Sequence, residues 1–193
     1  MFPVERRRSP RSRRAGARSA AAGGAALLLA ATAGCGTLPS GTDAELSDEI
    51  NLMSTMLQEG EALPDLYTCD GEGVSPSLQW SGLPGGDVTQ SLALVVDAPE
   101  DAVVFWVLYG LDPQSAELRQ NTVPQPGEQG LNSEGEPAYD PPCFSEDGAS
   151  EIRFTLYALN SEVDLPNDAP LDESLDAIAD RAVARGSLTV TNE

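Results

Sequence analysis

The sequence predicts a mainly β protein, an antiparallel two-sheet β-sandwich with one or two peripheral helices. Short apolar runs rich in Val, Leu and aromatic residues recur along the chain, and 15 Pro and 18 Gly residues separate them from one another. A clear helical pattern occurs once, close to the C-terminus. Many short strands with few helices are typical of sandwich architectures.

The predicted strands follow one another as compact apolar segments that end at turn residues. Segments of this length and composition favour strands over helices. The first of them runs directly into a turn that is rich in Gly and Pro, over residues 82–86. The predicted strands are residues 78–80, 91–97, 103–111, 152–159 and 186–191.

One helix is predicted over residues 172–184, immediately before the final strand. Asp172 can cap its N-terminus and Gly186 lies just past its end. A single helical stripe holds its apolar residues Leu175, Ile178, Ala179 and Ala182. A shorter helical turn is predicted over residues 114–120. The segment 121–150 is rich in Pro, Gly and acidic residues, and it is predicted to be a long loop.

The N-terminal part divides the chain into three predicted regions. Residues 1–34 have the order of a secretory signal peptide, with an arginine-rich start, a short apolar stretch and then small residues. Ala33-Gly34-Cys35 resembles a bacterial lipobox, in which Cys35 becomes the lipidated first residue; ordinary cleavage after residues 31–33 is the alternative. Residues 35–50 then form the lipidated Cys and a flexible tether. Residues 51–193 form the folded domain, exported and held on the extracytoplasmic face of the cell membrane.

Charge and composition exclude several functions. The chain has no His and no Lys, and seven of its 11 Arg residues lie within residues 1–18, whereas 30 of its 31 acidic residues follow residue 34. Such an acidic surface repels nucleic acid. Without imidazole there is no Ser-His or Cys-His pair, and the commonest zinc ligand is missing. We therefore expect no enzyme activity, no cofactor and no metal site. A hydrolase that uses carboxylates alone is a distant alternative.

Beyond Cys35, the folded domain contains two cysteines, Cys69 and Cys143. In an exported protein such a pair indicates a disulfide. Two buried free thiols are the alternative.

Four segments in this order resemble the phosphatidylethanolamine-binding proteins, in their bacterial Raf-kinase-inhibitor-like branch. The resemblance covers residues 51–191 and implies two antiparallel sheets with a C-terminal helical element. The segments are Tyr67-Thr68-Cys69-Asp70-Gly71 with Ser75-Pro76 and Trp80, Asp97-Ala98-Pro99-Glu100 with Phe105-Trp106-Val107-Leu108-Tyr109, Asn132–Gly135 with Tyr139-Asp140-Pro141-Pro142-Cys143, and Phe154–Leu159.

The resemblance also implies a small pocket for phosphate-like groups at one end of the sandwich, and here the sequence departs from the family pattern. Phe105 and Ser150 stand where the family has histidines, and Glu151 stands where it has Arg. The strongest donors to an anion are therefore missing. The residues predicted to line this degenerate pocket are Asp97, Glu100, Phe105, Tyr139, Pro141 and Ser150.

The most favoured function is a non-enzymatic, membrane-tethered binding domain. Its expected partners are a small anionic or phospholipid-like ligand, bound weakly, and the membrane through its lipid anchor. The alternative is a protein-interaction module that inhibits a kinase or a protease, because some relatives act in this way through surface contacts.

Overall fold

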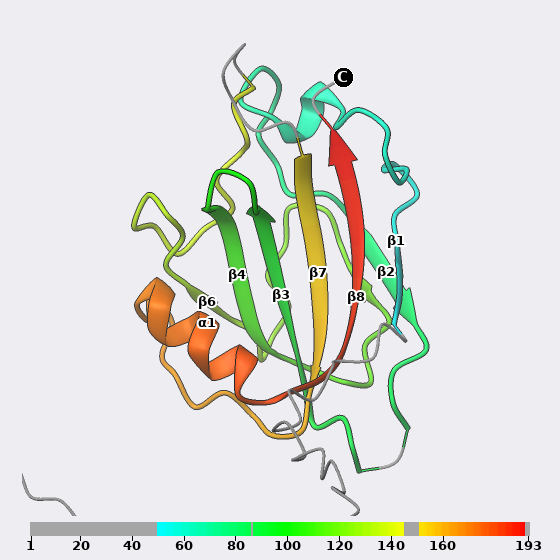
Figure 1. Ribbon diagram of the computed structural model, residues 1–193, viewed down its shortest axis with the longest axis vertical. Helices are drawn as coiled ribbons and strands as arrows, with labels where there is room; N and C mark the ends of the chain where they lie inside the picture. Colours follow the sequence, from blue (N-terminus) through cyan, green and yellow to red (C-terminus); the bar gives the residue numbers. More distant parts are fainter. Residues whose placement is uncertain (1–49, 86, 145–150, 192–193) are drawn as a thin grey trace, which may run out of the picture. The chain divides into compact units, whose positions relative to one another are not determined.

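The computed structural model describes residues 50–85, 87–144 and 151–191. Within them, eight strands form two antiparallel sheets (Figure 1). The smaller sheet has the order β1-β2-β5, and the larger has the order β6-β4-β3-β7-β8. The strands are β1 (Asn51–Met53), β2 (Leu78–Ser81), β3 (Ser91–Ala98), β4 (Val103–Leu111), β5 (Glu117–Leu118), β6 (Glu128–Gly130), β7 (Glu151–Leu159) and β8 (Ala182–Thr191).

The main core lies between the two sheets. Side chains alternate across a strand, so Leu92, Leu94 and Val96 of β3 point inward. They pack in one buried cluster with Leu78 and Trp80 of the smaller sheet. The mainly β sandwich predicted from the sequence is confirmed.

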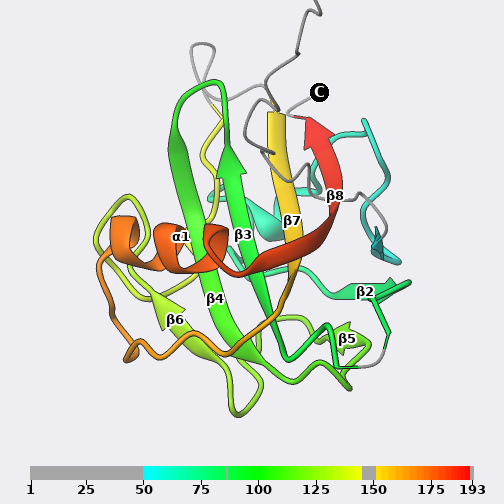
Figure 2. The same ribbon diagram turned by 60° about the horizontal axis from the view of Figure 1, so that its bottom comes forward.

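The helix α1 (Leu171–Ala179) covers the other face of the larger sheet (Figure 2). Its buried Ile178 packs in a second cluster with Val95 of β3 and with Val107 and Tyr109 of β4. A short 3-10 helix, η1 (Asp65–Tyr67), precedes β2. Among the described residues, no helix combines the length and the apolar character needed to cross a membrane.

Three local predictions were wrong. The helix ends at Ala179 rather than at residue 184, because Ala182 begins β8 by pairing with Leu159 of β7. Residues 117–118 form strand β5, not part of a helical turn, since they pair with Leu78 and Gln79 of β2. The predicted loop 121–150 contains β6, which pairs with β4 at the edge of the larger sheet.

β8 is the last strand of the larger sheet, and the segment that follows β1 covers its outer edge. Gly60 N–H donates to the carbonyl of Thr189 at 2.8 Å, and Leu63 N–H donates to that of Thr191 at 2.8 Å. An uncovered edge strand can pair with another chain, so this segment protects the sheet from aggregation.

Candidate functional site

A β-bulge in β4 sets the direction of the two aromatic residues at the predicted site. Val96 of β3 pairs with Trp106, whereas its neighbour Asp97 pairs with Val104, so Phe105 is the extra residue. A bulge interrupts the alternation of side chains. As a result, Phe105 and Trp106 both belong to the cluster between the sheets, where Phe105 is 7% exposed.

The loop between β6 and β7 brings Tyr139 against Trp106. Buried Asn132 holds this loop, because its Oδ1 accepts N–H groups from Glu134 and Glu136 at 3.0 Å each, and its Nδ2 donates to the carbonyl of Ala138 at 3.1 Å. The rings of Trp106 and Tyr139 meet edge to face with centroids 5.6 Å apart. Such pairs stabilise a defined aromatic wall.

These rings line a cleft of about 210 Å³. Trp106 Nε1 donates a 2.7 Å hydrogen bond to Gln129 Oε1, and this bond fixes the orientation of the indole ring. Among the described residues, no charged side chain lines the cleft. Its lining consists of Gly73, Ser75, Trp106, Asn121, Thr122, Val123, Gln129, Ala138 and Tyr139.

A disulfide joins two segments that contribute residues to this cleft. Cys69 and Cys143 form the bond, with their Cα atoms 5.2 Å apart. Cys69 N–H also donates to the carbonyl of Pro142 at 3.1 Å, and Pro141 lies against Gly73. The segment that holds Gly73 is thereby held close to the segment that holds Tyr139.

The Tyr139 hydroxyl contributes to this connection. It donates a 2.8 Å hydrogen bond to the carbonyl of Tyr67. Burial raises the pKa of Tyr139, and the nearby Asp140 carboxylate raises it further. The phenol is therefore neutral at physiological pH, and its proton is already shared with a backbone oxygen.

The structure brings some of the predicted residues together and separates others. Phe105 lies beside the Tyr139 loop, since its carbonyl accepts the Asp140 N–H at 2.9 Å, and Pro141 is half-buried in the same loop. Glu100 is exposed in the turn between β3 and β4. Ser150 and Cys35 lie outside the described residues.

Asp97 lies on the other face of the sheet from Phe105 and Tyr139. Asp97 follows Val95 by two residues in β3, so both side chains point to the face that α1 covers. The Asp97 carboxylate accepts two hydrogen bonds from Arg153, one of 2.7 Å from Nη2 and one of 3.1 Å from Nε. The hydrogen bond with Asp97 raises the pKa of Arg153. The carboxylate of Asp97 is thus held by a bidentate ion pair away from the cleft.

Several residues of the cleft could not be recognised in the sequence. Gln129 and Asn121 lie in the segment 121–150, which was predicted to be a long loop. Trp106 is buried, at 2% exposed, but one edge of its indole reaches the cleft. The sequence carries no signal for this arrangement, because it depends on the bulge and on the path of the loop.

Two packed antiparallel sheets, a helix over the outer face and a cleft beside Tyr139 define a phosphatidylethanolamine-binding-protein type of sandwich. The family model described as "Phosphatidylethanolamine-binding protein" matches residues 53–193. The chain therefore belongs to this family.

Similar proteins agree with this assignment. A protein named "UPF0098 protein" from Methanothermobacter thermautotrophicus is 33% identical over 147 residues, which is 72% of this chain and 95% of the relative. One from Mycobacterium tuberculosis, named "Putative lipoprotein LppC", is 34% identical and covers 81% of this chain and 79% of its own.

Two solved structures share the fold. A homologue of the phosphatidylethanolamine-binding proteins from Chlamydia trachomatis superposes with a TM-score of 0.66 at 30% identity, covering 76% of this chain and 99% of its own. YbcL of E. coli superposes with a TM-score of 0.68 at 22% identity, covering 75% and 98%.

Proposed function

We propose that this protein is a non-enzymatic binding domain whose ligand occupies the cleft beside Trp106 and Tyr139. The observation that carries this proposal is the character of that cleft. It has an aromatic wall and a polar, uncharged lining, in a chain with 31 acidic residues. A concave site with an aromatic wall and a few polar groups suits a small polar molecule.

The proposed ligand is held without a strong charge interaction. Phosphate is bound tightly by charged donors such as Arg or protonated His, whose hydrogen bonds are about twice as strong as neutral ones. Phe105, which stands where relatives of this type are expected to carry His, is packed in the core. The cleft therefore offers a phosphate-bearing headgroup only neutral donors, and its affinity for such a group is weak.

The same geometry supports binding rather than catalysis. General acid–base work needs a group whose pKa lies near the working pH. Burial raises the pKa of Tyr139, and the Tyr139 hydroxyl donates its hydrogen bond to the carbonyl of Tyr67. No other titratable side chain lines the cleft among the described residues.

We also propose that the domain is exported and anchored to the membrane by a lipid on Cys35. The lipobox-like residues before Cys35 support this, and so does the lipoprotein name of the mycobacterial relative. The acidic residues between Cys35 and β1, such as Glu45 and Asp48, suit a tether held off a membrane surface.

Ligand-induced thermal stabilisation tests the binding proposal. O-phosphoethanolamine should stabilise the mature protein only slightly, because the cleft has no cationic donor. Thr122 lines the cleft and is exposed, so Thr122→Arg adds a cationic donor there. This variant should bind O-phosphoethanolamine about tenfold more tightly or better, as charge-assisted hydrogen bonds contribute about 1.5–3 kcal/mol, whereas the neutral control Thr122→Gln should not. Tight binding by the natural protein, with no gain in Thr122→Arg, would refute the proposed site.

A further inference from the structure

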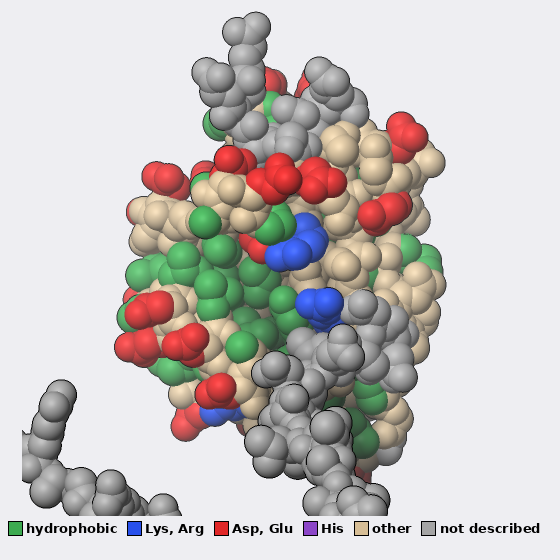
Figure 3. Space-filling view, viewed as in Figure 1, with side chains coloured by type: hydrophobic (Ala, Val, Ile, Leu, Met, Phe, Trp, Pro, Cys, Tyr) green, Lys and Arg blue, Asp and Glu red, His purple; other side chains and the backbone are tan. Residues whose placement is uncertain are grey.

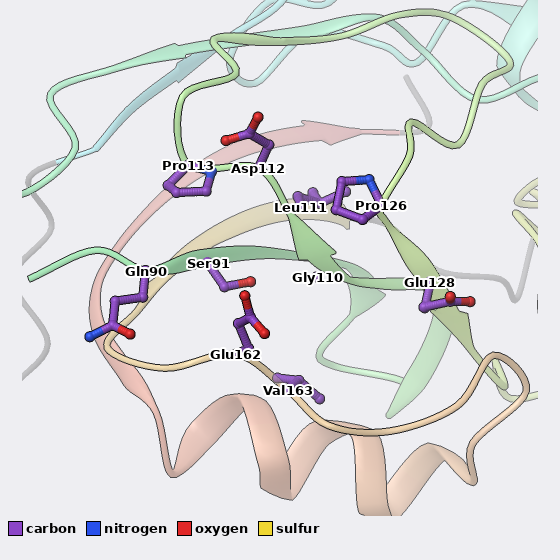
Figure 4. A pocket seen from close by; sticks show the side chains of 10 residues that line it. All are labelled: Gln90, Ser91, Gly110, Leu111, Asp112, Pro113, Pro126, Glu128, Glu162 and Val163. Atoms are coloured by element: carbon purple, nitrogen blue, oxygen red, sulfur yellow. The ribbon is translucent and has the colours of Figure 1, made fainter. Parts of the chain in front are cut away.

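A second cavity lies at the end of β3 and β4 remote from the bulge at Phe105. It has a volume of about 320 Å³, and the start of β3, the end of β4, β6 and the segment after β7 form its walls (Figure 4). Its floor is made by buried residues, which include Leu111 and Val163, exposed by 2% and 8%. The size falls within the range of small-molecule sites.

A second β-bulge opens this cavity. Leu92 pairs with Leu111 and Leu94 pairs with Leu108, so β4 has one extra residue in this stretch. Gly110 lies in the bulge with a φ of 69°, a left-handed conformation that glycine adopts without strain. Since Gly110 has no side chain, the space in front of the strand stays open.

Three carboxylates from separate parts of the chain surround the opening. Asp112 follows β4, Glu128 begins β6 and Glu162 follows β7, and all three are exposed. No basic side chain of the described residues lines this cavity. Carboxylates only accept hydrogen bonds, so the rim selects a ligand that carries donors and positive charge.

An unpartnered hydroxyl on the floor gives independent evidence for a ligand. Ser91 is 2% exposed, and its Oγ has no hydrogen-bond partner. Figure 4 shows the Ser91 hydroxyl and the Glu162 carboxylate turned toward the same part of the cavity. A buried polar group without a partner costs about 1–3 kcal/mol, and it calls for an explanation. A ligand that donates to this oxygen supplies one.

We infer that this cavity binds a small organic cation, an alkylammonium compound with a short apolar body. One ammonium group meets the carboxylate of Glu162 and donates to Ser91, a second meets the carboxylate of Glu128, and the carbon chain between them lies on Leu111 and Val163. In the described part of the chain, no three acidic or Cys side chains are grouped closely enough to hold a metal ion. The spacing of the carboxylates therefore suits a ligand with spread-out donors better than a point charge.

Calorimetric titration of the full mature protein with 1,4-diaminobutane tests this inference, with uncharged 1,4-butanediol as the matched probe. The diamine should bind and the diol should not. Glu162→Gln should weaken diamine binding about fivefold, as expected for an exposed ion pair. Glu72→Gln removes the same charge from an exposed position outside the cavity, and it should change the affinity by less than about twofold.

Ser91→Ala gives a second, independent readout. Because it removes an unsatisfied buried hydroxyl, the variant should fold with unchanged or higher stability in the absence of ligand. It should nevertheless bind the diamine more weakly than the natural protein. Equal losses in Glu162→Gln and Glu72→Gln would show diffuse charge attraction and overturn the inference, as would unchanged diamine affinity in Ser91→Ala.

Discussion

Single residues decide what the cleft at Tyr139 can do. Phe105 replaces an expected cationic donor with a buried ring, and the Tyr139 hydroxyl is used to hold Tyr67. Asp97, an acidic residue of the same sequence motif, is paired with Arg153 on the opposite face. Neutral groups therefore determine the chemistry of the cleft, although acidic residues such as Asp140 lie close to the lining residues in the sequence.

Tyr139→Phe should destabilise the fold by about 1–2 kcal/mol, because the carbonyl of Tyr67 loses its hydrogen-bond donor. Tyr67→Phe is the matched control. The Tyr67 hydroxyl is buried and has no partner, so its removal should leave the stability unchanged or raise it. Urea unfolding of both variants measures the difference, and equal effects would contradict the assigned role of Tyr139.

The same tyrosines predict an alkaline limit to stability. Burial is the largest cause that raises the pKa of each of the four tyrosines, Tyr67, Tyr109, Tyr139 and Tyr157. The unfolded chain then loses its phenolic protons at a lower pH than the folded protein. The unfolding free energy should consequently fall as the pH rises above about 10, the ordinary tyrosine value, and Tyr139→Phe should make that fall less steep.

At the scale of elements, close contacts between backbones determine how strands assemble. Gly186 of β8 lies so near Ile50 that an added Cβ would overlap the carbonyl oxygen of Ile50. Ile50 N–H donates to the carbonyl of Arg185 at 3.3 Å in the same place. The residue before β1 can reach β8 only because position 186 has no side chain.

Gly186→Ala should therefore destabilise the protein by about 1–3 kcal/mol, the cost of overpacking a close contact. Gly85→Ala is the control, because nothing lies within 4 Å of a Cβ added there and residue 85 is exposed. Thermal unfolding should show a lower midpoint for Gly186→Ala alone. A midpoint equal to that of Gly85→Ala would mean that β8 and residue 50 separate easily.

At the scale of the whole molecule, charge is the dominant property. Of the 11 Arg residues, only Arg119, Arg153, Arg181 and Arg185 follow residue 34, against 30 acidic residues. Acidic side chains are spread over the face shown in Figure 3, with basic ones at few places. This surface disfavours anionic partners in general and favours cationic ligands, in agreement with the cation site inferred at Glu162.

The proposed anchor belongs to this scale because it determines where the domain works. Expressed in a bacterium that processes lipoproteins, the full chain should fractionate with membranes, and Cys35→Ala should release it or stop its maturation. Mass spectrometry of the N-terminal peptide should find a lipid-modified Cys35. An unmodified terminus that begins upstream of Cys35 would refute the anchor.

The sequence alone determined the fold class, the family resemblance and most of the long strands, since these depend on local apolar runs and on motif order. Strands β3, β4 and β7 are such runs. The short strands β1, β5 and β6 were not predicted, because two or three residues carry too little pattern and form a strand only where a neighbouring strand pairs with them.

Only the tertiary structure decided the sites. Whether a strand residue faces the cleft or the outer surface depends on register, and one extra residue reverses the direction of those around it. Asp97 and Phe105 belong to one sequence motif, but they lie on opposite faces of the larger sheet. The bulge turns Phe105 toward the core, and Asp97 pairs with Arg153 on the other face. The cavity at Ser91 joins residues from distant segments, and their proximity arises from the pairing of strands and from no local pattern.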